Sequence, residues 1–482
     1  MTRREWGLLG LVAGLGWMIP ALSFDLRLPD EPRVAHTSFE MLRTGDFVVP
    51  TVNGRPFLQT PPLHYWILGT WIWLADNGRD GLARIPSVLL GLGTLLVVGR
   101  MASRRSSGRV AFLSVGTLAS TMGFWDGGQR VVVDVSMTFF ITLALWQVSE
   151  ALADGDFTVR SGLLAGLATG CAFLSKGFSG PVIVASAAAI PLCLVRGIPR
   201  RALLNWCSGL VLGCCLVALP WTVLLWLRDP AYASELLFSH VSARFLHGTH
   251  KDASNFAFVH RSILKLLPWG LALPLAIACA VRAVRGNREV REGDRKWQAM
   301  LLSWFFLPLV LLLISRSKRN IYLLPVFPAF AMLLGLWLER LILRGHRERH
   351  VLALLWAGAV LLPIGGFAYQ RWNTAESTLE PLGRHVAGLD RTGAVVVGYR
   401  LAEREEGALG WYLRHSFENV EDEVALLAVL RRAGSSAVAV GEERELAEAL
   451  EKIGVANPET KVKFRQRLRG RILEACQVML PD

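Results

Sequence analysis

The chain has 482 residues, of which 52% are hydrophobic and 19% are charged, and its mean hydropathy is +0.38. Soluble enzymes of this length are less apolar, so the composition excludes that class and indicates a polytopic membrane protein. The net charge of +13 does not indicate a nucleic-acid partner, because residues 370–482 carry 16 Lys and Arg against 18 Asp and Glu. The first 369 residues carry 36 against 21, and positive charge in the loops of a membrane region is a topology signal.

Eleven apolar runs predict membrane-spanning helices. They lie near residues 5–24, 84–101, 109–125, 132–150, 161–177, 179–195, 203–227, 257–281, 298–315, 320–339 and 350–369. The first run follows Arg3 and Arg4, lacks an A-x-A-like site and precedes a charged segment, so we expect an uncleaved span. A twelfth run, residues 63–75, has only 13 residues. Counting it as a span would turn the basic loops outward, so we expect it to be re-entrant or interfacial.

Eleven spans place the N-terminus and the basic loops in the cytoplasm and the C-terminus outside. The outer face then carries two long loops, residues 25–62 and 228–256. These outer loops mix acids, His, Arg, Pro and aromatic residues, whereas the inner loops are basic and otherwise plain. We therefore expect the chemistry on the outer face of a transmembrane domain, residues 1–369.

The segment 370–482 differs in character from the rest of the chain. Residues 394–400 and 435–443 are typical of short buried strands, and residues 421–434 and 443–455 show the apolar spacing of amphipathic helices. Alternating strands and helices predict a small outer α/β domain. It has no phosphate-loop glycine motif, His cluster or serine elbow, so we expect it to be structural or to recognise the acceptor.

The stretch "FDLRLPDEPRVAHTSFEMLRTGDFVVPTVNGRPFLQTPPLHYW" opens the first outer loop with Asp30 and Glu31, followed by Arg33. One interpretation is a short interfacial helix with acids favoured at its N-terminus by the helix dipole. The other is an acid acting as a general base at the membrane surface, with Arg33 setting its charge or binding an anion. The residues alone leave both open.

Further polar residues lie at the outer ends of predicted spans. Lys176 either extends its charged end to the interface or holds a phosphate. Arg130 and Asp134, four residues apart, form a local ion pair or contribute to a site. The loop "HVSARFLHGTHKD" contains Arg244, His250 and two more histidines, whose spacing matches no helical zinc-ligand pair.

The turn "SRSKRNIYLLP" concentrates Arg316, Lys318 and Arg319 where positive charge is least expected. A phosphate at the membrane surface explains these cations better than topology does. Outward cations and an acid beside an apolar interior are what a transferase with a lipid-linked phosphosugar donor needs. The cations stabilise the departing phosphate while the acid deprotonates an acceptor hydroxyl.

These motifs resemble those of a known family, the C-type-fold (GT-C) membrane glycosyltransferases, in particular the lipid A aminoarabinose transferases and their protein O-mannosyltransferase-like relatives. The segment "DEPRVAHTSFEMLRTGDFVVPTVNGRPFLQTPPLHYW" resembles the family pattern D-E-x-R-Y-A-E…M-L…G-D-W-V-V-P…N-G…Y-x-E-K-P-P-L-x-Y-W. Further matches in family order are "RVVVDVSMTFF", "FLSKGFSGP", "RFLHGTHKD", "LLPW" and "SKRNIYLLPVFPA". They cover roughly residues 1–345.

The resemblance implies inverting transfer of a sugar from a polyprenyl phosphate at the periplasmic face of a bacterial inner membrane. It implies Asp30 as the catalytic acid, with Glu31 beside it, and Arg33 as the family's nearby arginine. The donor phosphate is then expected to contact Arg33 and a further set of residues, namely Lys176, Arg244, Lys318, Arg319 and Tyr322. Other candidate positions are Arg130, Asp134 and His250.

Two departures from the family pattern stand out. Gln59-Thr60 replaces the usual Glu-Lys before Pro-Pro-Leu, and His36-Thr37 replaces part of Tyr-Ala-Glu. The first removes a carboxylate that the family associates with metal binding and a lysine that it associates with the donor phosphate, so it argues against a divalent metal cofactor. We hypothesise that Arg316 or Arg319 replaces the missing lysine.

The sequence thus predicts an all-α polytopic membrane glycosyltransferase with interfacial helices and a small C-terminal α/β domain. The expected partners are a polyprenyl-phosphate-linked sugar, a lipid A, glycolipid, glycan or protein acceptor, and membrane lipids. The alternative is a non-catalytic transporter or lipid-binding protein of the same architecture. Transporters place polar groups at mid-membrane between broken helices, whereas here they gather at outer span ends.

Overall fold

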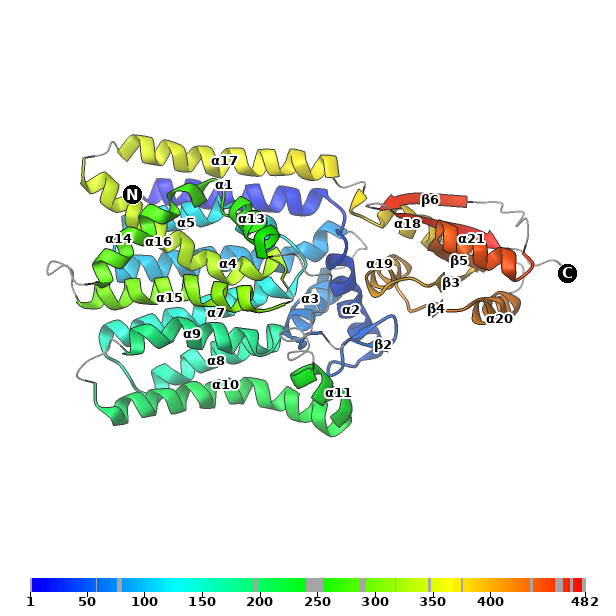
Figure 1. Cartoon of the computed structure of the whole chain (residues 1–482), viewed down its shortest axis with the longest axis horizontal. Helices are drawn as coiled ribbons and strands as arrows, with labels where there is room; N and C mark the ends of the chain where they lie inside the picture. The colour runs from blue at the N-terminus through cyan, green and yellow to red at the C-terminus, as the bar shows by residue number, and fades with distance from the viewer. Residues whose placement is uncertain are drawn as a thin grey trace. The chain divides into compact units, whose positions relative to one another are not determined.

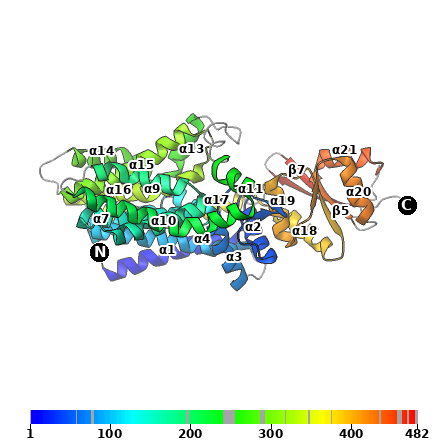
Figure 2. The same ribbon diagram turned by 90° about the horizontal axis from the view of Figure 1, so that it is seen from below.

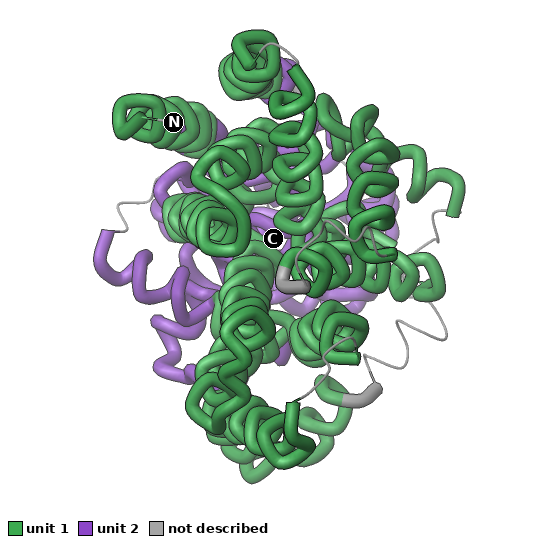
Figure 3. The backbone as a smooth tube through the Cα atoms, turned by 90° about the vertical axis from the view of Figure 1, so that its left-hand side faces the viewer, with its two compact units in different colours: residues 1–21, 58–64, 84–367 green, residues 22–57, 65–83, 368–482 purple. Residues whose placement is uncertain are grey.

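A computed structural model describes residues 2–57, 59–75, 80–193, 198–239, 255–285, 292–316, 318–345, 348–373, 376–433, 437–455, 463–468 and 471–478. The chain divides into two compact units, coloured separately in Figure 3. Unit 1 comprises residues 1–21, 58–64 and 84–367, and unit 2 comprises residues 22–57, 65–83 and 368–482. Most of the predicted first outer loop therefore belongs to the same unit as the C-terminal segment.

Unit 1 consists of long apolar helices (Figure 1), and each of the eleven predicted spans falls on helix. Seven helices in the described part of the chain are long and apolar enough to cross a membrane, namely Arg3–Ser23, Asp80–Arg105, Val133–Asp154, Arg200–Arg228, Asp294–Ile314, Asn320–Leu343 and Glu348–Trp372. An eighth is added if Asn255–Lys265 and Trp269–Val284, which are bent by 103°, form one span. The predicted polytopic helical fold is confirmed.

The remaining predicted spans are short helices. The helices α5 (Gly108–Ala119), α9 (Ser179–Cys193) and α8 (Val159–Lys176) have 12, 15 and 18 residues. At 1.5 Å per residue they are about 18–27 Å long, less than the roughly 30 Å of a bilayer core. Counting helices by length and apolarity therefore gives seven or eight spans among the described residues, whereas the apolar runs of the sequence predict eleven. The helix α3 (Leu63–Ala75), with 13 residues, is shorter than a span, as predicted.

Glycines allow α8 and α10 (Arg200–Arg228) to pack backbone against backbone. They recur every four residues, at Gly162 and Gly166 on α8 and at Gly209 and Gly213 on α10. A Cβ at Gly166 would lie 2.2 Å from the Leu210 carbonyl oxygen, and one at Gly209 would lie 2.2 Å from that of Val159. Such small-residue spacing is the usual means of close helix packing where apolar burial provides no drive.

The C-terminal part of unit 2 is a three-layer α/β structure. Its five-stranded sheet has the order β4-β3-β5-β7-β6, with strands Glu418–Val420, Val395–Tyr399, Ala437–Glu442, Arg471–Val478 and Lys463–Leu468. Strand β3 is parallel to β4 and β5, with Val397 opposite Glu418 and Ala439, and β7 is antiparallel to both β5 and β6. Figure 2 shows this region from a second direction.

Alternating side chains of the sheet face two helix layers. Val396 packs with α18 (Glu380–Asp390) and α19 (Glu403–Leu413), whereas Val397 packs with α20 (Glu423–Ala433) and α21 (Glu443–Lys452). Strands β3 and β5 and helices α20 and α21 coincide with the elements predicted from the sequence.

Unit 2 also contains α2 (Glu31–Thr44) and the β1–β2 hairpin (Thr51–Val52 and Arg55–Pro56). Glycines on α19 let α2 pack closely against it, because a Cβ at Gly407 would lie 2.9 Å from Arg33 and one at Gly410 would lie 2.4 Å from the His36 ring. The predicted active-site loop and the C-terminal segment are therefore built into one hydrophobic and polar network.

Candidate functional site

One end of unit 1 brings together three of the predicted site residues. The carboxylate of Asp134 forms an ion pair with Nζ of Lys176, and these side chains are only 5% and 10% exposed. The same Nζ lies 4.0 Å from the ring centroid of Tyr322. A cation over an aromatic face, paired with a buried carboxylate, is an ordered charged group at the edge of an apolar bundle.

Helix ends explain this arrangement. Asp134 lies in the first turn of α7 (Val133–Asp154), Lys176 is the last residue of α8, and Tyr322 lies in the short helix η4 (Asn320–Val326). An acid at a helix N-terminus and a base at a C-terminus are each stabilised by the helix dipole. The short α7–α8 connection places these two ends side by side.

A second charged group belongs to the same unit. Asp126 accepts from Nη2 of Arg130 at 3.2 Å and from Nζ of Lys265 at 2.8 Å. Arg130 therefore pairs one turn back along the chain, and Asp134 pairs across to α8. The interpretation of Arg130 and Asp134 as a local pair is replaced by these two contacts. Sequence analysis did not single out Asp126, which directly follows one predicted span, or Lys265, which lies within another.

The opposite end of unit 1 carries the residues predicted to face the cytoplasm. Nη2 of Arg105 lies 2.9 Å from Glu150, near the C-terminal end of α7, and Nε of Arg109 lies 3.2 Å from Glu348. Asp134 is at the other end of the same helix α7. The basic loops and the candidate site thus occupy opposite ends of unit 1, as the positive-inside pattern predicts.

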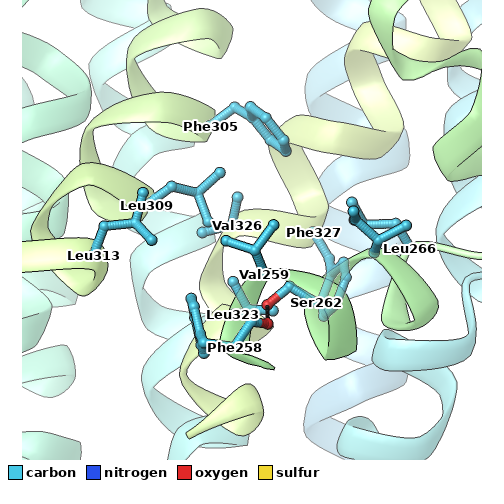
Figure 4. Close-up of a pocket in the computed structure, with 11 residues that line it drawn as sticks. Phe258, Val259, Ser262, Leu266, Phe305, Leu309, Leu313, Leu323, Val326 and Phe327 are labelled. Carbon is cyan, nitrogen blue, oxygen red and sulfur yellow. Dashed lines mark hydrogen bonds between the residues drawn. The ribbon is translucent and has the colours of Figure 1, made fainter. Parts of the chain in front are cut away.

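An apolar cavity of about 170 Å³ lies within unit 1 (Figure 4). Side chains from α13 (Asn255–Lys265), α15 (Glu292–Ile314) and the η4–α16 segment converge on it, including Phe258, Ile263, Leu309, Leu323 and Phe327. Its one polar lining residue, Ser262, donates to the carbonyl of Phe258. Leu323 directly follows Tyr322, and Lys265 directly precedes Leu266 of the lining, so a tyrosine and a lysine adjoin the apolar lining along the chain.

The other predicted phosphate contacts are placed less tightly. Lys318 and Arg319 are half-buried just before η4. Arg244 and His250 lie outside the described residues, so their expected place in the site stays a prediction. Arg316, the hypothetical replacement for the family lysine, is exposed.

Asp30, Glu31 and Arg33 open α2 in unit 2. The helix begins at Glu31 with Asp30 as its N-cap, so the interfacial helix considered from the sequence is present. The Asp30 carboxylate makes no capping bond and instead pairs with Nη2 of Arg33 at 2.9 Å. Nη1 of Arg33 also lies 2.6 Å from Glu403, and its guanidinium is 5.1 Å from the centroid of Phe57. Arg33 thus holds Asp30 at a fixed position.

Glu31 differs from Asp30 in its surroundings. Its side chain is buried, and Oε2 accepts a hydrogen bond from the backbone amide of Arg27 at 2.8 Å. Nε of Arg27 lies 3.7 Å from the same oxygen. These contacts indicate that Glu31 stabilises the turn before α2. Asp30 is therefore the better candidate of the two acids for a catalytic role.

A third acid, Glu40, organises the rest of the loop. Its buried carboxylate accepts from the hydroxyls of Thr51 and Ser416 at 2.7 Å each and from the amide of Gly54 at 3.0 Å. Nε2 of His36 lies 3.1 Å from it. Burial alone would raise the pKa of Glu40, but His36, Ser416 and Thr51 outweigh that and lower its pKa to about 2. His36, one of the departures from the family pattern, thus has a structural partner.

Metal binding is not supported by the donor groups of the described residues. Among them, no three His, Cys, Asp or Glu side chains are grouped as metal ligands. Gln59 and Thr60, which replace the family's Glu-Lys, contribute neither a carboxylate nor an amine. The described residues at this position therefore offer no carboxylate, imidazole or thiolate ligand set for a metal.

Known proteins share this sequence pattern. Residues 59–226 match the family described as dolichyl-phosphate-mannose-protein mannosyltransferase. Two relatives are undecaprenyl phosphate-alpha-4-amino-4-deoxy-L-arabinose arabinosyl transferases. The one from Pseudomonas aeruginosa (strain UCBPP-PA14) is 30% identical to this chain over 386 residues, and the one from Edwardsiella ictaluri is 28% identical over 372 residues. These matches cover 77% and 75% of this chain and 66% and 64% of the relatives. The chain thus spans slightly less than two thirds of these relatives' length.

Solved structures share its fold. The crystal structure of ArnT from Cupriavidus metallidurans bound to undecaprenyl phosphate matches with a TM-score of 0.72 at 20% identity, over 100% of both chains. The Archaeoglobus fulgidus oligosaccharyltransferase in complex with Zn and sulfate matches with a TM-score of 0.60 at 12% identity, over 91% of this chain and 68% of that one. The chain therefore has the C-type (GT-C) fold of these polytopic membrane proteins.

With this fold and its similarity to the aminoarabinose transferases, the chain is a multi-pass protein of the bacterial inner membrane. The side on which each terminus lies remains a prediction from the charge pattern. The match of Asp30 and Asp134 to the family's first loop and second acidic position stays a prediction from the sequence. The buried polar network around Glu40 could not be predicted from sequence spacing, because its members lie up to 376 residues apart.

Proposed function

We propose that the chain transfers a sugar from a polyprenyl-phosphate donor of the undecaprenyl type to an acceptor at the periplasmic face, with inversion at the anomeric carbon. The acceptor is lipid A or another glycolipid, glycan or protein. The observation that carries this proposal is the 30% identity over 386 residues to transferases whose donor is an undecaprenyl phosphate-linked aminoarabinose.

The arrangement in unit 1 supports the donor assignment. A polyprenyl chain is apolar and its phosphate is anionic, and unit 1 combines an apolar cavity with the charged pair at Lys176 and the ring of Tyr322. Lysine contacts to a departing phosphate stabilise the charge that develops in the transition state. Lys176 is therefore the first candidate for that contact, with Lys265 as the second.

Asp30 is the proposed general base. Its carboxylate takes the proton of the acceptor hydroxyl as that oxygen bonds to the anomeric carbon, and the bond from that carbon to the phosphate oxygen breaks at the same time. The electron pair leaves with the phosphate, so the products are the glycosylated acceptor and free polyprenyl phosphate. Arg33 positions the Asp30 carboxylate through their ion pair.

Reconstitution in proteoliposomes tests the proposal. A panel of undecaprenyl-phosphate sugars, including the 4-amino-4-deoxy-L-arabinose donor, is supplied with lipid A, and the lipids are analysed by mass spectrometry. We expect one donor to give an acceptor heavier by one sugar residue together with free undecaprenyl phosphate. Binding of undecaprenyl phosphate without turnover of any donor would instead favour the lipid-binding or transporter alternative.

A further inference from the structure

Arg340 lies between three helices at one end of unit 1. It belongs to the last turn of α16 (Phe327–Leu343), and its half-buried side chain reaches α14 (Leu273–Val284) and α15. Its Nη1 donates to the carbonyl of Cys279 at 3.3 Å and contacts the sulfur of that residue, and its Nη2 donates to Oε1 of Gln298 at 3.3 Å. The three helices pack against one another (Figure 1). We call this place the α14–α15–α16 junction.

The junction lies at the end of unit 1 opposite Asp134. The residue before Arg340, Glu339, accepts a hydrogen bond from the hydroxyl of Ser107, the N-cap of α5. Ser107 follows Arg105 by two residues, and Arg105 forms an ion pair with the C-terminal part of α7. Asp134 lies at the N-terminal end of that helix. The junction is therefore on the side that the charge pattern predicts to face the cytoplasm, away from the proposed donor contacts.

Arg340 differs from two other half-buried arginines of this end in its partners. Arg105 pairs with Glu150, and Arg109 pairs with Glu348. In the part of the chain that the structure describes, Arg340 contacts only the neutral acceptors named above and forms no ion pair. A half-buried charge with only neutral partners is costly unless an anion approaches it.

The segments that meet here carry a net positive charge even when every acid is counted. Residues 282–296 and 339–350 contain ten Lys and Arg against five Asp and Glu. Two of those acids, Glu339 and Glu348, are already engaged with the start of α5. The carboxylates of these segments therefore leave a positive excess around Arg340.

Two exposed arginines extend this positive charge to the surface. Arg344 ends α16 four residues after Arg340, and Arg282 follows Cys279 by three residues on α14, so each lies one turn from the junction. Arginine forks match phosphate oxygens. For a multi-pass membrane protein, the phosphates available at the ends of the helices are those of the lipid head groups, and basic pockets between transmembrane helices bind anionic ones.

We propose that the α14–α15–α16 junction binds the head group of an anionic glycerophospholipid, with Arg340 as its main phosphate contact. The guanidinium has more N–H groups than its contacts with Cys279 and Gln298 use, and these donate to the phosphate oxygens. Arg282 and Arg344 approach the same head group from the surface, while the acyl chains lie along the apolar helices. The proposal is independent of the proposed function, because these residues lie at the other end of unit 1 from Lys176.

Lipid binding to the delipidated full chain tests the site. Native mass spectrometry in detergent follows the first lipid adduct as dioleoylphosphatidylglycerol is added. We expect Arg340→Gln, which loses the charge and keeps a polar side chain, to weaken that adduct at least about tenfold. The matched control is Arg349→Gln, an exposed arginine of α17 (Glu348–Asn373) outside the junction, which should bind as the wild type does. Equal affinity in all three proteins, or no adduct with the wild type, would overturn the proposal.

A second variant separates lost charge from a damaged bundle. The double variant Arg282→Gln/Arg344→Gln changes only exposed side chains and should weaken phosphatidylglycerol binding at least about threefold. Dioleoylphosphatidylcholine, which has a phosphodiester but no net charge, should bind the wild type and both variants alike. Unchanged phosphatidylglycerol binding by the double variant, or equal loss of both lipids in Arg340→Gln, would contradict the site.

A last arm distinguishes two sources of lipid phosphate. Undecaprenyl phosphate should bind the wild type and Arg340→Gln alike, because its proposed contact Lys176 lies at the other end of unit 1. Loss of undecaprenyl phosphate binding with intact phosphatidylglycerol binding would assign the junction to the polyprenyl phosphate and refute the phospholipid site.

Discussion

In unit 1 the charged partners are close along the chain or lie at neighbouring helix ends, whereas unit 2 adds to its local pairs several that join segments far apart. Lys176 and Asp134 are 42 residues apart, but Arg33 and Glu403 are 370 apart and Glu40 and Ser416 are 376 apart. Unit 1 therefore places its charges through helix direction, and unit 2 places them through tertiary folding of the first loop with the C-terminal segment.

This difference implies different weak points. Unit 1 depends on backbone-to-backbone helix packing through glycines, and its charges are supported by helix dipoles. Unit 2 depends on buried hydrogen bonds to carboxylates, whose loss leaves unsatisfied donors. Changes in unit 1 should therefore act on the bundle as a whole, and changes in unit 2 should act on one loop and on its pH dependence.

The largest effect is expected for Gly166→Leu in unit 1. Even a Cβ there would lie 2.2 Å from the Leu210 carbonyl oxygen, and backbone cannot move aside as a side chain can. Overpacking normally costs about 1–3 kcal/mol, and we expect more here, with loss of monodisperse protein in detergent gel filtration. Gly10→Leu on α1 is the control, since nothing lies within 4 Å of its added Cβ. Equal behaviour of both variants would contradict glycine-mediated packing.

The next largest effect is expected for Lys176→Ala. It leaves the buried carboxylate of Asp134 without its cation, which costs about 3–5 kcal/mol, and it removes the proposed phosphate contact, which lowers kcat by about 100-fold. Thermal unfolding and the transfer assay measure the two effects. The double variant with Asp134→Asn should recover thermal stability without recovering transfer. Recovery of both stability and transfer in the double variant would show that Lys176 is only structural. The surface control is Arg200→Ala, because Arg200 is an exposed arginine of α10.

Acid should weaken unit 2 through Glu40. Its pKa is lowered from 4.5 to about 2 in the folded chain, so its contribution is fully present above about pH 4.5 and is lost as the pH falls toward 2. At 1.36 kcal/mol per pKa unit this is on the order of 3 kcal/mol. Hydrogen exchange of residues 51–56 and 416–420 between pH 5 and pH 3 should show the opening. Unchanged protection over that range would contradict the assigned role.

A smaller effect is expected for Glu40→Gln. The amide keeps only one oxygen acceptor for the donors of Thr51, Ser416 and Gly54, so we expect a loss of about 2 kcal/mol. The acid sensitivity of the loop should disappear in the same variant. Glu418→Gln is the matched control, because Glu418 forms an exposed pair with Arg432 that is worth less than about 1 kcal/mol.

The sequence predicts the apolar architecture and the helix-end charges well, for a physical reason. Membrane spans can be recognised by their length and composition, and Asp134 and Lys176 are recognisable as charges at the ends of apolar runs. The grouping of residues 22–57 with residues 368–482 could not be predicted in this way, because it depends on Gly407 and Gly410 accepting α2 and on Glu40 reaching Ser416. The glycine spacing of α8, "GLLAGLATG", is a sequence signal for close helix packing.

Release of undecaprenyl phosphate from a radiolabelled donor, compared between the wild type and Asp30→Asn in proteoliposomes, tests the central claim most directly. The variant should fold, because Arg33 keeps its contacts with Glu403 and Phe57. We predict acceptor-dependent release by the wild type and at least about 100-fold slower release by Asp30→Asn with donor binding retained. Equal rates in the two proteins, or no release by the wild type from any donor, would contradict the account.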